Sequence, residues 1–240
     1  MSRLTSNPQL PKLGIGNWQL GVGSRIYVIA LVDQPGRAVT IAGRRIEIVR
    51  AGGLFAAIES GVGPLPRHPD LSEAALREQH AIVVALARRF DAILPARFGA
   101  WVDPPTLEQT LTTNRTRIRR ALARVKNRDQ FTIRILGDRQ DTPPDLSSGT
   151  AYLRSRRAAS RPRLTRAARD VRRAVKPLVR AEQIDSGRGS IRLTIHHLID
   201  RGRARAYRAA VRQSVIRASD EQVVVSGPWP PFAFAPDLLP

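Results

Sequence analysis

The sequence predicts an α+β fold in two domains, an N-terminal antiparallel sheet with packed helices and a C-terminal ferredoxin-like α+β unit. Three observations support this fold class. Short β-branched segments follow one another near the start of the 240-residue chain, two long amphipathic segments come next, and a strand, helix, strand order closes the chain. A loop rich in Gly, Asp, Pro and Ser separates the halves, so we expect a linker at 137–150.

The first domain is expected at 25–136. Its first three strands are predicted in "RIYVIALV" from Arg25, in "RRIEIVR", which alternates with period two, and in "GGLFAAIES". The loop "DQPGR" follows the first of them. Short connections between successive strands favour antiparallel pairing over a parallel sheet built from crossovers. A further strand, Gln130 to Leu136, is expected to complete this unit.

Two helices are predicted between these strands. Asp70 and Glu73 have capping-box spacing and predict the start of the first helix. Its expected core stripe is Leu76, His80, Val83, Val84, Ala87 and Phe90, and we interpret His80 as a residue flanking that stripe. Asp103, Pro104 and Pro105 predict the start of the second helix, whose expected stripe is Leu107, Leu111, Ile118, Leu122 and Val125.

The second domain is expected at 151–226. Residues 151–180 are helical in pattern but are divided by Pro162 and Pro177, which predicts two pieces. The strand "SIRLTIHHLI", a helix from about Gly202 to Arg217 and the strand "EQVVVSG" follow. A helix crossing between two strands of one sheet is half of a ferredoxin-like unit. Residues 1–24 are expected to be a flexible leader, and 227–240 an aromatic and proline-rich arm.

Several function classes find no support in the residues. The chain has no cysteine, which excludes disulfides, thiolate chemistry and cysteine-ligated metals and favours a cytoplasmic location. It carries no G-x-S-x-G or Walker-type motif. His196 and His197 are adjacent, so on a strand they face opposite sides and cannot chelate one metal together. No apolar run of transmembrane length and no secretory signal is present. We therefore expect no enzyme, cofactor or metal site.

Charge suggests one alternative function. The net charge is +20, and residues 151–217 hold 19 Lys and Arg against four acids, a net of +15. Such a block favours an anionic partner, either nucleic acid or another anionic surface, although it lacks a helix-turn-helix or zinc signature and stacking aromatics. A solvated arginine-rich helix explains the block equally well. The candidate polyanion contacts are Arg154, Arg156, Arg157, Arg161, Arg163, Arg166, Arg169, Arg172, Arg173, Lys176 and Arg180.

Two motifs are more specific. In "ILPARFGAWV" a short apolar strand runs into a loop with Arg97 and the anchor Phe98, and Arg97 is expected to clamp carbonyls or a carboxylate under the sheet. In the closing "GPWPPFAFA" the prolines stiffen an arm that carries Trp229, Phe232 and Phe234, so docking it costs little chain entropy. We expect these aromatics to fill a groove, most simply on the same chain and otherwise on a partner.

Together with "GTAYLRSRR", these elements resemble, in order, the gas vesicle accessory proteins of the GvpL/GvpF family over roughly Arg25 to Ala235. The resemblance implies a non-enzymatic cytoplasmic protein that assists gas vesicle assembly and contacts the small hydrophobic shell protein and other accessory proteins. Charge departs from the family pattern, because members tend to be acidic, and this leaves the partner open. The family motif falls on Leu94, Pro95, Arg97, Phe98, Gly99, Gly149, Tyr152, Leu153, Gly227, Pro228, Trp229, Pro230, Pro231 and Phe232.

Overall fold

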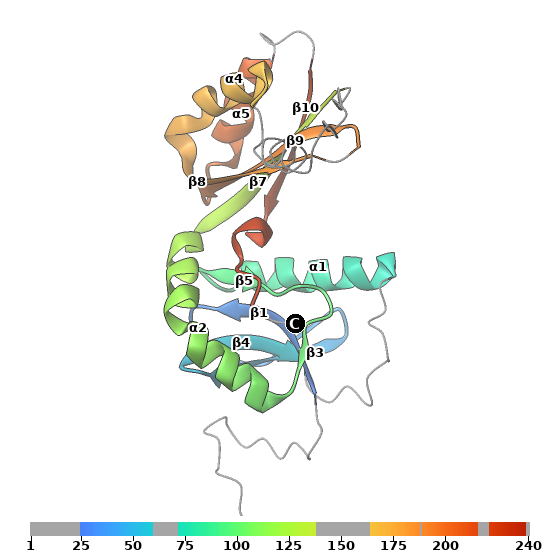
Figure 1. Ribbon diagram of the computed structural model, residues 1–240. Coiled ribbons are helices and arrows are strands. Elements are labelled where there is room, and N and C mark those ends of the chain that lie inside the picture. The colour runs from blue at the N-terminus through green and yellow to red at the C-terminus, as the bar shows by residue number, and fades with distance from the viewer. Residues whose placement is uncertain (1–24, 60–71, 138–163, 188, 216–220, 239–240) are drawn as a thin grey trace, which may run out of the picture.

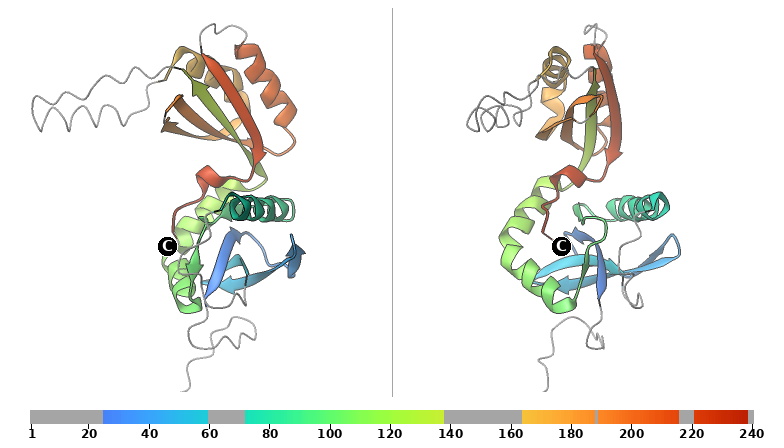
Figure 2. Two further views of the ribbon diagram at one scale, coloured as in Figure 1. Left: turned by 90° about the vertical axis from the view of Figure 1, so that its right-hand side faces the viewer. Right: turned by 45° about the vertical axis from the view of Figure 1, so that its right-hand side comes forward.

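The computed structural model describes residues 25–59, 72–137, 164–187, 189–215 and 221–238. These residues form two antiparallel sheets, one above the other in Figure 1, each packed against its own helices. Figure 2 shows the chain crossing between them twice, once where helix α2 runs into strand β7 and once where strand β10 leads back down to the C-terminal residues. The mixed α+β class with antiparallel sheets is therefore confirmed.

The first sheet has the order β2-β3-β4-β1-β5, and β6 also pairs with β1. Its strands are β1 (Ile26–Val32), β2 (Val39–Ile41), β3 (Arg44–Ala51), β4 (Leu54–Glu59), β5 (Ile93–Pro95) and β6 (Trp101–Val102). All of the pairs are antiparallel, with Leu31 opposite Ala56 on one side and Leu94 on the other. Every residue of β1 is buried, as expected for a central strand whose two faces are both covered.

Helices α1 (Glu73–Ala87) and α2 (Pro104–Val125) cover the two faces of this sheet. The predicted start and core stripe of α2 are confirmed. Asp103 caps the helix by accepting the amide of Thr106 at 2.8 Å, and these bonds to Thr106 lower the pKa of the Asp103 carboxyl. The five predicted stripe residues are all buried.

The predicted core stripe of α1 is only partly confirmed, since Val83 and Phe90 are buried as expected but Leu76 is not. Ser72 caps the helix by accepting the amide of Ala75, so the cap is not Asp70, which lies outside the described residues. The buried residues of α1 are Gln79, Ile82, Val83 and Leu86, while Leu76 is 45% exposed. Hydropathy favours Leu76 over Gln79 as a core residue. The sequence pattern cannot reveal that the side-chain oxygen of Gln79 accepts a hydrogen bond from the buried hydroxyl of Tyr27, which allows this polar residue to occupy a core position.

The second sheet has the order β10-β7-β9-β8, again with every pair antiparallel. In chain order its elements are β7 (Arg128–Leu136), α4 (Arg166–Val175), the 3-10 turn η1 (Lys176–Leu178), β8 (Val179–Ser186), β9 (Ile191–Asp200), α5 (Ala204–Val215) and β10 (Gln222–Trp229). Both helices pack on one face, where Phe131, Ile195 and Tyr207 are fully buried.

Three sequence expectations need correction here. The strand predicted at 130–136 forms, but it lies in the second sheet rather than completing the first, so residue 136 does not separate the two sheets. The predicted helical region overlaps strand β8 at its last two residues, and the rest of β8 was not predicted; β8 is an edge strand with no buried residue and therefore a weak hydropathy pattern. Strand β2 was not predicted because it is only three residues long.

Apolar packing and hydrogen bonds join the two sheets. Leu198 of β9 and Phe234, from the short 3-10 turn η2 (Phe232–Phe234), belong to the same buried cluster as the core stripe of α2. The Arg201 guanidinium donates to the carbonyl oxygens of Ala87 and Phe90 at the end of α1, at 3.0 and 3.1 Å. Within the described part of the chain, no helix combines the length and apolarity needed to cross a membrane.

Candidate docking site

A pocket of ≈ 370 Å³ lies where the two sequence motifs meet. Its walls come from α1, from β5 with the loop after it, and from the residues that follow β10. The motif residues Leu94, Pro95, Arg97 and Phe98 line one side, and Phe232 with residues 235–238 lines another. The structure thus brings together two motifs separated by more than a hundred residues of chain.

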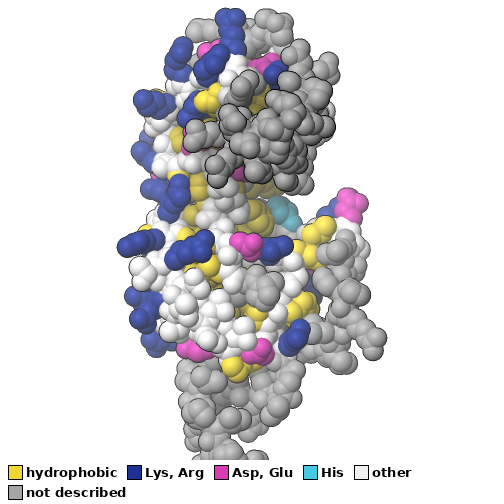
Figure 3. Space-filling view, in the orientation of Figure 1, with side chains coloured by type: hydrophobic (Ala, Val, Ile, Leu, Met, Phe, Trp, Pro, Cys, Tyr) yellow, Lys and Arg dark blue, Asp and Glu magenta, His cyan; other side chains and the backbone are white. Residues whose placement is uncertain are grey.

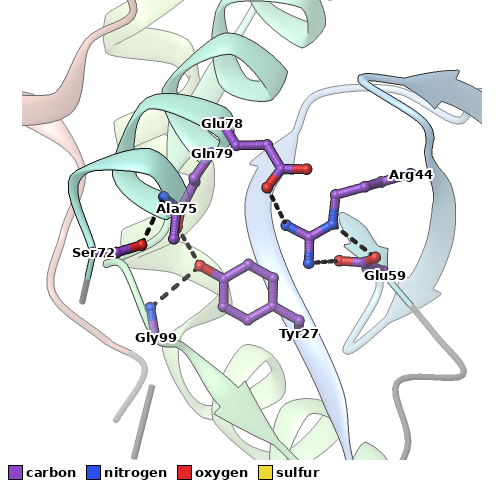
Figure 4. A network of polar contacts seen from close by, with 8 residues as sticks. All are labelled: Tyr27, Arg44, Glu59, Ser72, Ala75, Glu78, Gln79 and Gly99. Carbon is purple, nitrogen blue, oxygen red and sulfur yellow. Dashed lines mark hydrogen bonds and ion pairs between the residues drawn. The ribbon is translucent and has the colours of Figure 1, made fainter. Parts of the chain in front are cut away.

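Tyr27 of β1 positions two of these walls (Figure 4). Its hydroxyl donates to the side-chain oxygen of Gln79 on α1 and accepts the amide of Gly99 at 3.2 Å. Burial raises the pKa of Tyr27, which keeps the hydroxyl protonated and able to donate. Gly99 has φ +84°, a conformation that favours glycine, so this motif residue sets the path of the loop.

An ion-pair network holds α1 on the sheet beside Tyr27. The Arg44 guanidinium of β3 contacts Glu59 of β4 at 2.7 Å and Glu78 of α1 at 3.6 Å (Figure 4). The next two residues of the helix, Gln79 and His80, line the pocket together with Leu76. The ion pairs therefore fix the wall formed by α1, while its one apolar side chain in the pocket, Leu76, remains exposed to solvent.

The C-terminal arm begins later than the sequence suggested. Gly227, Pro228 and Trp229 belong to strand β10, with Trp229 opposite Gln130 of β7. A Cβ on Gly227 would lie 2.7 Å from the carbonyl oxygen of Gln130, and its φ is +126°, so a larger residue does not fit there. Beyond Pro230 and Pro231, the amide of Ala233 donates to the Gln130 side chain at 2.8 Å.

The three arm aromatics play different parts. Phe234 is 8% exposed, lies in the first core cluster and has the Arg124 guanidinium 5.4 Å above its ring. Trp229 and Phe232 are 36% and 39% exposed. Both contact the His80 ring, Trp229 edge-on at 5.4 Å and Phe232 stacked at 5.6 Å between centroids. The arm therefore docks on its own chain through Phe234. We expected all three aromatic side chains to fill a groove, but only Phe234 is buried.

Arg97 and His80 take places that the sequence only partly indicated. Arg97 does pair with a carboxylate, that of Asp237 at 3.3 Å, but the pair is solvent-exposed rather than under the sheet. His80 lines the pocket and contacts the arm. Local sequence pattern could not reveal either contact, because both depend on where the distant C-terminal residues return.

The basic residues predicted from charge are spread over several elements. Five of these basic residues and three residues of the family motif lie outside the described residues. The basic ones are Arg154, Arg156, Arg157, Arg161 and Arg163, and the motif residues are Gly149, Tyr152 and Leu153. Among the others, Arg172 makes two bonds to Glu182 at 2.7 and 2.8 Å, and Arg180 makes two to Asp200 at 2.6 and 2.9 Å. These two guanidinium groups are already engaged by carboxylates of the same chain, and polyanion binding by this block stays a prediction.

The second sheet contains a buried polar chain that the sequence did not suggest. His197, which is 1% exposed, lies 2.6 Å from the Tyr207 hydroxyl and 2.9 Å from Glu182. Burial lowers the pKa of His197 and raises that of Tyr207. A neutral imidazole with its proton on Nε2 donates to Glu182 and accepts from Tyr207, which satisfies both contacts.

This polar chain links the sheet to both of its helices, since Tyr207 lies on α5 and the partner of Glu182, Arg172, lies on α4. His196, on the other face, contacts Asp185 at 3.3 Å and Thr132 at 3.1 Å. In the part of the chain that the structure describes, no group of three or more His, Asp or Glu side chains is placed to hold a metal ion.

Comparison with known proteins agrees with this architecture. The family model described as gas vesicle synthesis protein GvpL/GvpF matches residues 25–236. The crystal structure of the gas vesicle protein GvpF from Anabaena sp. PCC7120 is similar, with a TM-score of 0.66 and 14% identity, and the match covers 89% of this chain and 98% of that one. GvpF from Microcystis aeruginosa gives 0.65 and 14%, covering 88% and 99%. No curated protein matches by sequence. The chain belongs to the GvpL/GvpF family of gas vesicle proteins.

Proposed function

We propose that this protein is a non-enzymatic accessory factor of gas vesicle assembly that binds an apolar segment of the hydrophobic shell protein in the pocket between α1, β5 and the arm. The segment packs against Leu76 and Phe232. Binding keeps apolar surface of the shell protein from contacts with other copies until it is added to the growing wall.

One observation carries this proposal. Among the described residues, four large hydrophobic side chains are exposed, and they are Leu76, Val224, Trp229 and Phe232. Two of them line the pocket, and a third, Trp229, contacts His80, which also lines it. Scattered exposed hydrophobics need no explanation, but a group of them around a concave site marks a binding surface.

The position of the arm adds a second argument. Its buried aromatic, Phe234, is anchored in the chain's own core, so the arm forms one wall of the pocket and is not a free segment waiting for a partner. The walls also unite the two motifs that carry the family resemblance. A site built from both motifs explains why they occur together in one chain.

Finer features belong to the same proposal. The β-α-β-β-α-β chain order of residues 128–229 and the sheet order β10-β7-β9-β8 support a ferredoxin-like second domain. We place the protein in the cytoplasm and at the gas vesicle, where the shell protein is its first partner and other accessory proteins are further partners.

A pull-down of tagged protein co-expressed with the host's small shell protein tests the proposal, with a wash at high salt. An apolar contact survives that wash because salt screens charges but does not weaken apolar burial. Leu76→Asp should abolish capture by placing a charge in the pocket. Val224→Asp is the matched control, because Val224 is similarly exposed, at 37%, but lies on β10 of the second sheet. Equal capture by both variants would refute the proposed site.

A further inference from the structure

Helix α2 presents an unusually basic face on the side away from the pocket. From Pro104 to Arg128 the sequence contains six Arg and one Lys against a single acid, Glu108. The buried stripe of α2 faces the sheet, and the helical repeat puts Arg117, Arg120 and Arg124 on the solvent side, where all three are exposed. Within the described ranges, neither Arg117 nor Arg120 has a carboxylate partner.

This face continues onto the second sheet. Arg128, the first residue of β7, donates to the carbonyl oxygen of Arg124 at the end of α2. The Arg128 side chain also lies 3.9 Å from Asp200, which in turn is held by Arg180 of β8. Figure 3 shows Lys and Arg side chains gathered along the left edge of the molecule, over α2 and over the second unit above it. We name Arg117, Arg120, Arg124, Arg128 and Arg180 the basic track.

Asp200 shows how two arginines of the track hold a carboxylate. Both the Nε and an Nη of Arg180 donate to one oxygen of its carboxylate. Arg128 approaches the other oxygen. The hydrogen bonds from Arg180, together with the positive charges of Arg180 and Arg128, lower the pKa of Asp200. The guanidinium is a planar donor group suited to carboxylates and phosphates. One carboxylate of the chain itself is thus already bound between Arg128 and Arg180, at one end of the track, and the positive charge continues from there along α2.

The choice between an acidic polypeptide and a nucleic acid follows from the aromatic residues. Binding of single strands combines a basic groove with aromatic side chains on which bases stack. The exposed aromatics of the described residues, Trp229 and Phe232, contact His80 on α1. No residue of α2 lines the pocket beside them. The track therefore offers charge without a stacking platform, and carboxylates fit it better than bases.

We propose that the basic track binds an acidic polypeptide segment, whose Asp or Glu side chains pair with Arg117 and Arg120 and continue toward Arg124. Neither Arg117 nor Arg120 lines the pocket, so this interaction uses other side chains than the shell-protein contact proposed above. A partner with an acidic helix or tail can occupy the track while the pocket holds an apolar segment.

The test uses the full chain and a dye-labelled polyglutamate peptide, with binding followed by fluorescence anisotropy at low salt. The double variant Arg117→Gln/Arg120→Gln should weaken binding by about fivefold, since each exposed pair contributes modestly. The matched control, Arg45→Gln/Arg77→Gln, removes the same charge from β3 and α1 and should leave affinity within about twofold of the wild type. All four side chains are exposed, so both variants should keep the wild-type melting temperature.

Three results would overturn the proposal. The first is no measurable binding of polyglutamate at low salt. The second is an equal loss in both double variants, which would mean that only net charge matters. The third is binding of a labelled oligonucleotide of equal charge that is stronger than that of polyglutamate and depends on Arg117 and Arg120, which would assign the track to nucleic acid. Capture of the shell protein at the pocket is unaffected by any of these results.

Discussion

The two sheets of this protein are stabilised in different ways. The first is covered on both faces, and its central strand β1 is buried throughout among apolar side chains. In the second, both of the helices that the structure describes pack on one face, and a polar chain runs from the buried Tyr207 and His197 to the half-buried Glu182 and Arg172. Stability of the first should therefore follow apolar packing, and stability of the second should also depend on hydrogen bonding and protonation.

The comparison teaches where a docking surface can form. The arm leaves the second sheet and inserts Phe234 into the core of the first, so the pocket wall depends on the more apolar of the two units. The variants and conditions below separate the two kinds of stabilisation.

The largest effect is expected for Phe234→Ala. The substitution leaves a cavity in the first core and detaches the arm from α2, so the free energy of unfolding should fall by about 3 to 5 kcal/mol. Urea unfolding followed by tryptophan fluorescence and far-UV circular dichroism measures this loss. A change below about 1 kcal/mol would show that the arm does not depend on this anchor.

The buried polar chain is tested by Tyr207→Phe. The substitution keeps the ring but leaves Nδ1 of His197 without its partner inside the second core. An unsatisfied buried group costs about 1 to 3 kcal/mol, and urea unfolding should show a loss in that range. An unchanged midpoint would mean that the hydroxyl contributes nothing and that the second core is held by apolar contacts alone.

Acid should destabilise the fold through both histidines of β9. Burial lowers the pKa values of His196 and His197 below their ordinary value of 6.5. At higher pH the histidines are neutral in both states and contribute nothing. As pH falls below about 6.5 the unfolded chain binds protons that the folded chain does not, so stability decreases by up to about 1.4 kcal/mol per pH unit for each histidine.

Denaturant titrations between about pH 7 and about pH 5 measure this slope. Burial raises the pKa of Glu182, but the hydrogen bonds from Arg172 and His197 outweigh burial and lower this pKa below its ordinary value of 4.5. Glu182 therefore adds to the loss of stability only at lower pH. His196→Gln and His197→Gln should each reduce the slope. The same slope in both variants as in the wild type would remove the histidines as its cause.

The smallest effect is expected for Trp229→Ala. Trp229 is partly exposed and its ring touches His80 only edge-on, so its loss should cost about 1 kcal/mol or less. Differential scanning calorimetry beside Phe234→Ala makes the contrast direct. If Trp229→Ala cost as much as Phe234→Ala, the division between a buried anchor and an exposed binding surface would fail.

Much of the fold was predictable from local pattern. The start and core stripe of helix α2 were predicted correctly because a capping aspartate, two prolines and a regular stripe agree with one another. The sequence could not predict that β7 joins the second sheet, because the alternation of apolar and polar residues along a strand does not indicate which sheet the strand joins. The edge strand β8 was missed because its side chains are half exposed and charged.

The candidate site was predictable in its parts but not in its assembly. Both motifs were recognisable from Pro, Gly and aromatic spacing, and the resemblance to the GvpL/GvpF family was correct. Their meeting at one pocket depends on the path of β10 back to α1, which no local pattern encodes. The division of labour among Trp229, Phe232 and Phe234 depends on burial in the same way.

The most direct measurement is site-specific photo-crosslinking in cells that also make the shell protein. A photo-crosslinking amino acid placed at position 76 should give a covalent adduct with the shell protein, because Leu76 is exposed in the pocket. The same amino acid at position 224, which is also exposed but lies on the second sheet, should give none. Adducts from position 224 with none from position 76 would contradict the central claim that the pocket is the docking site.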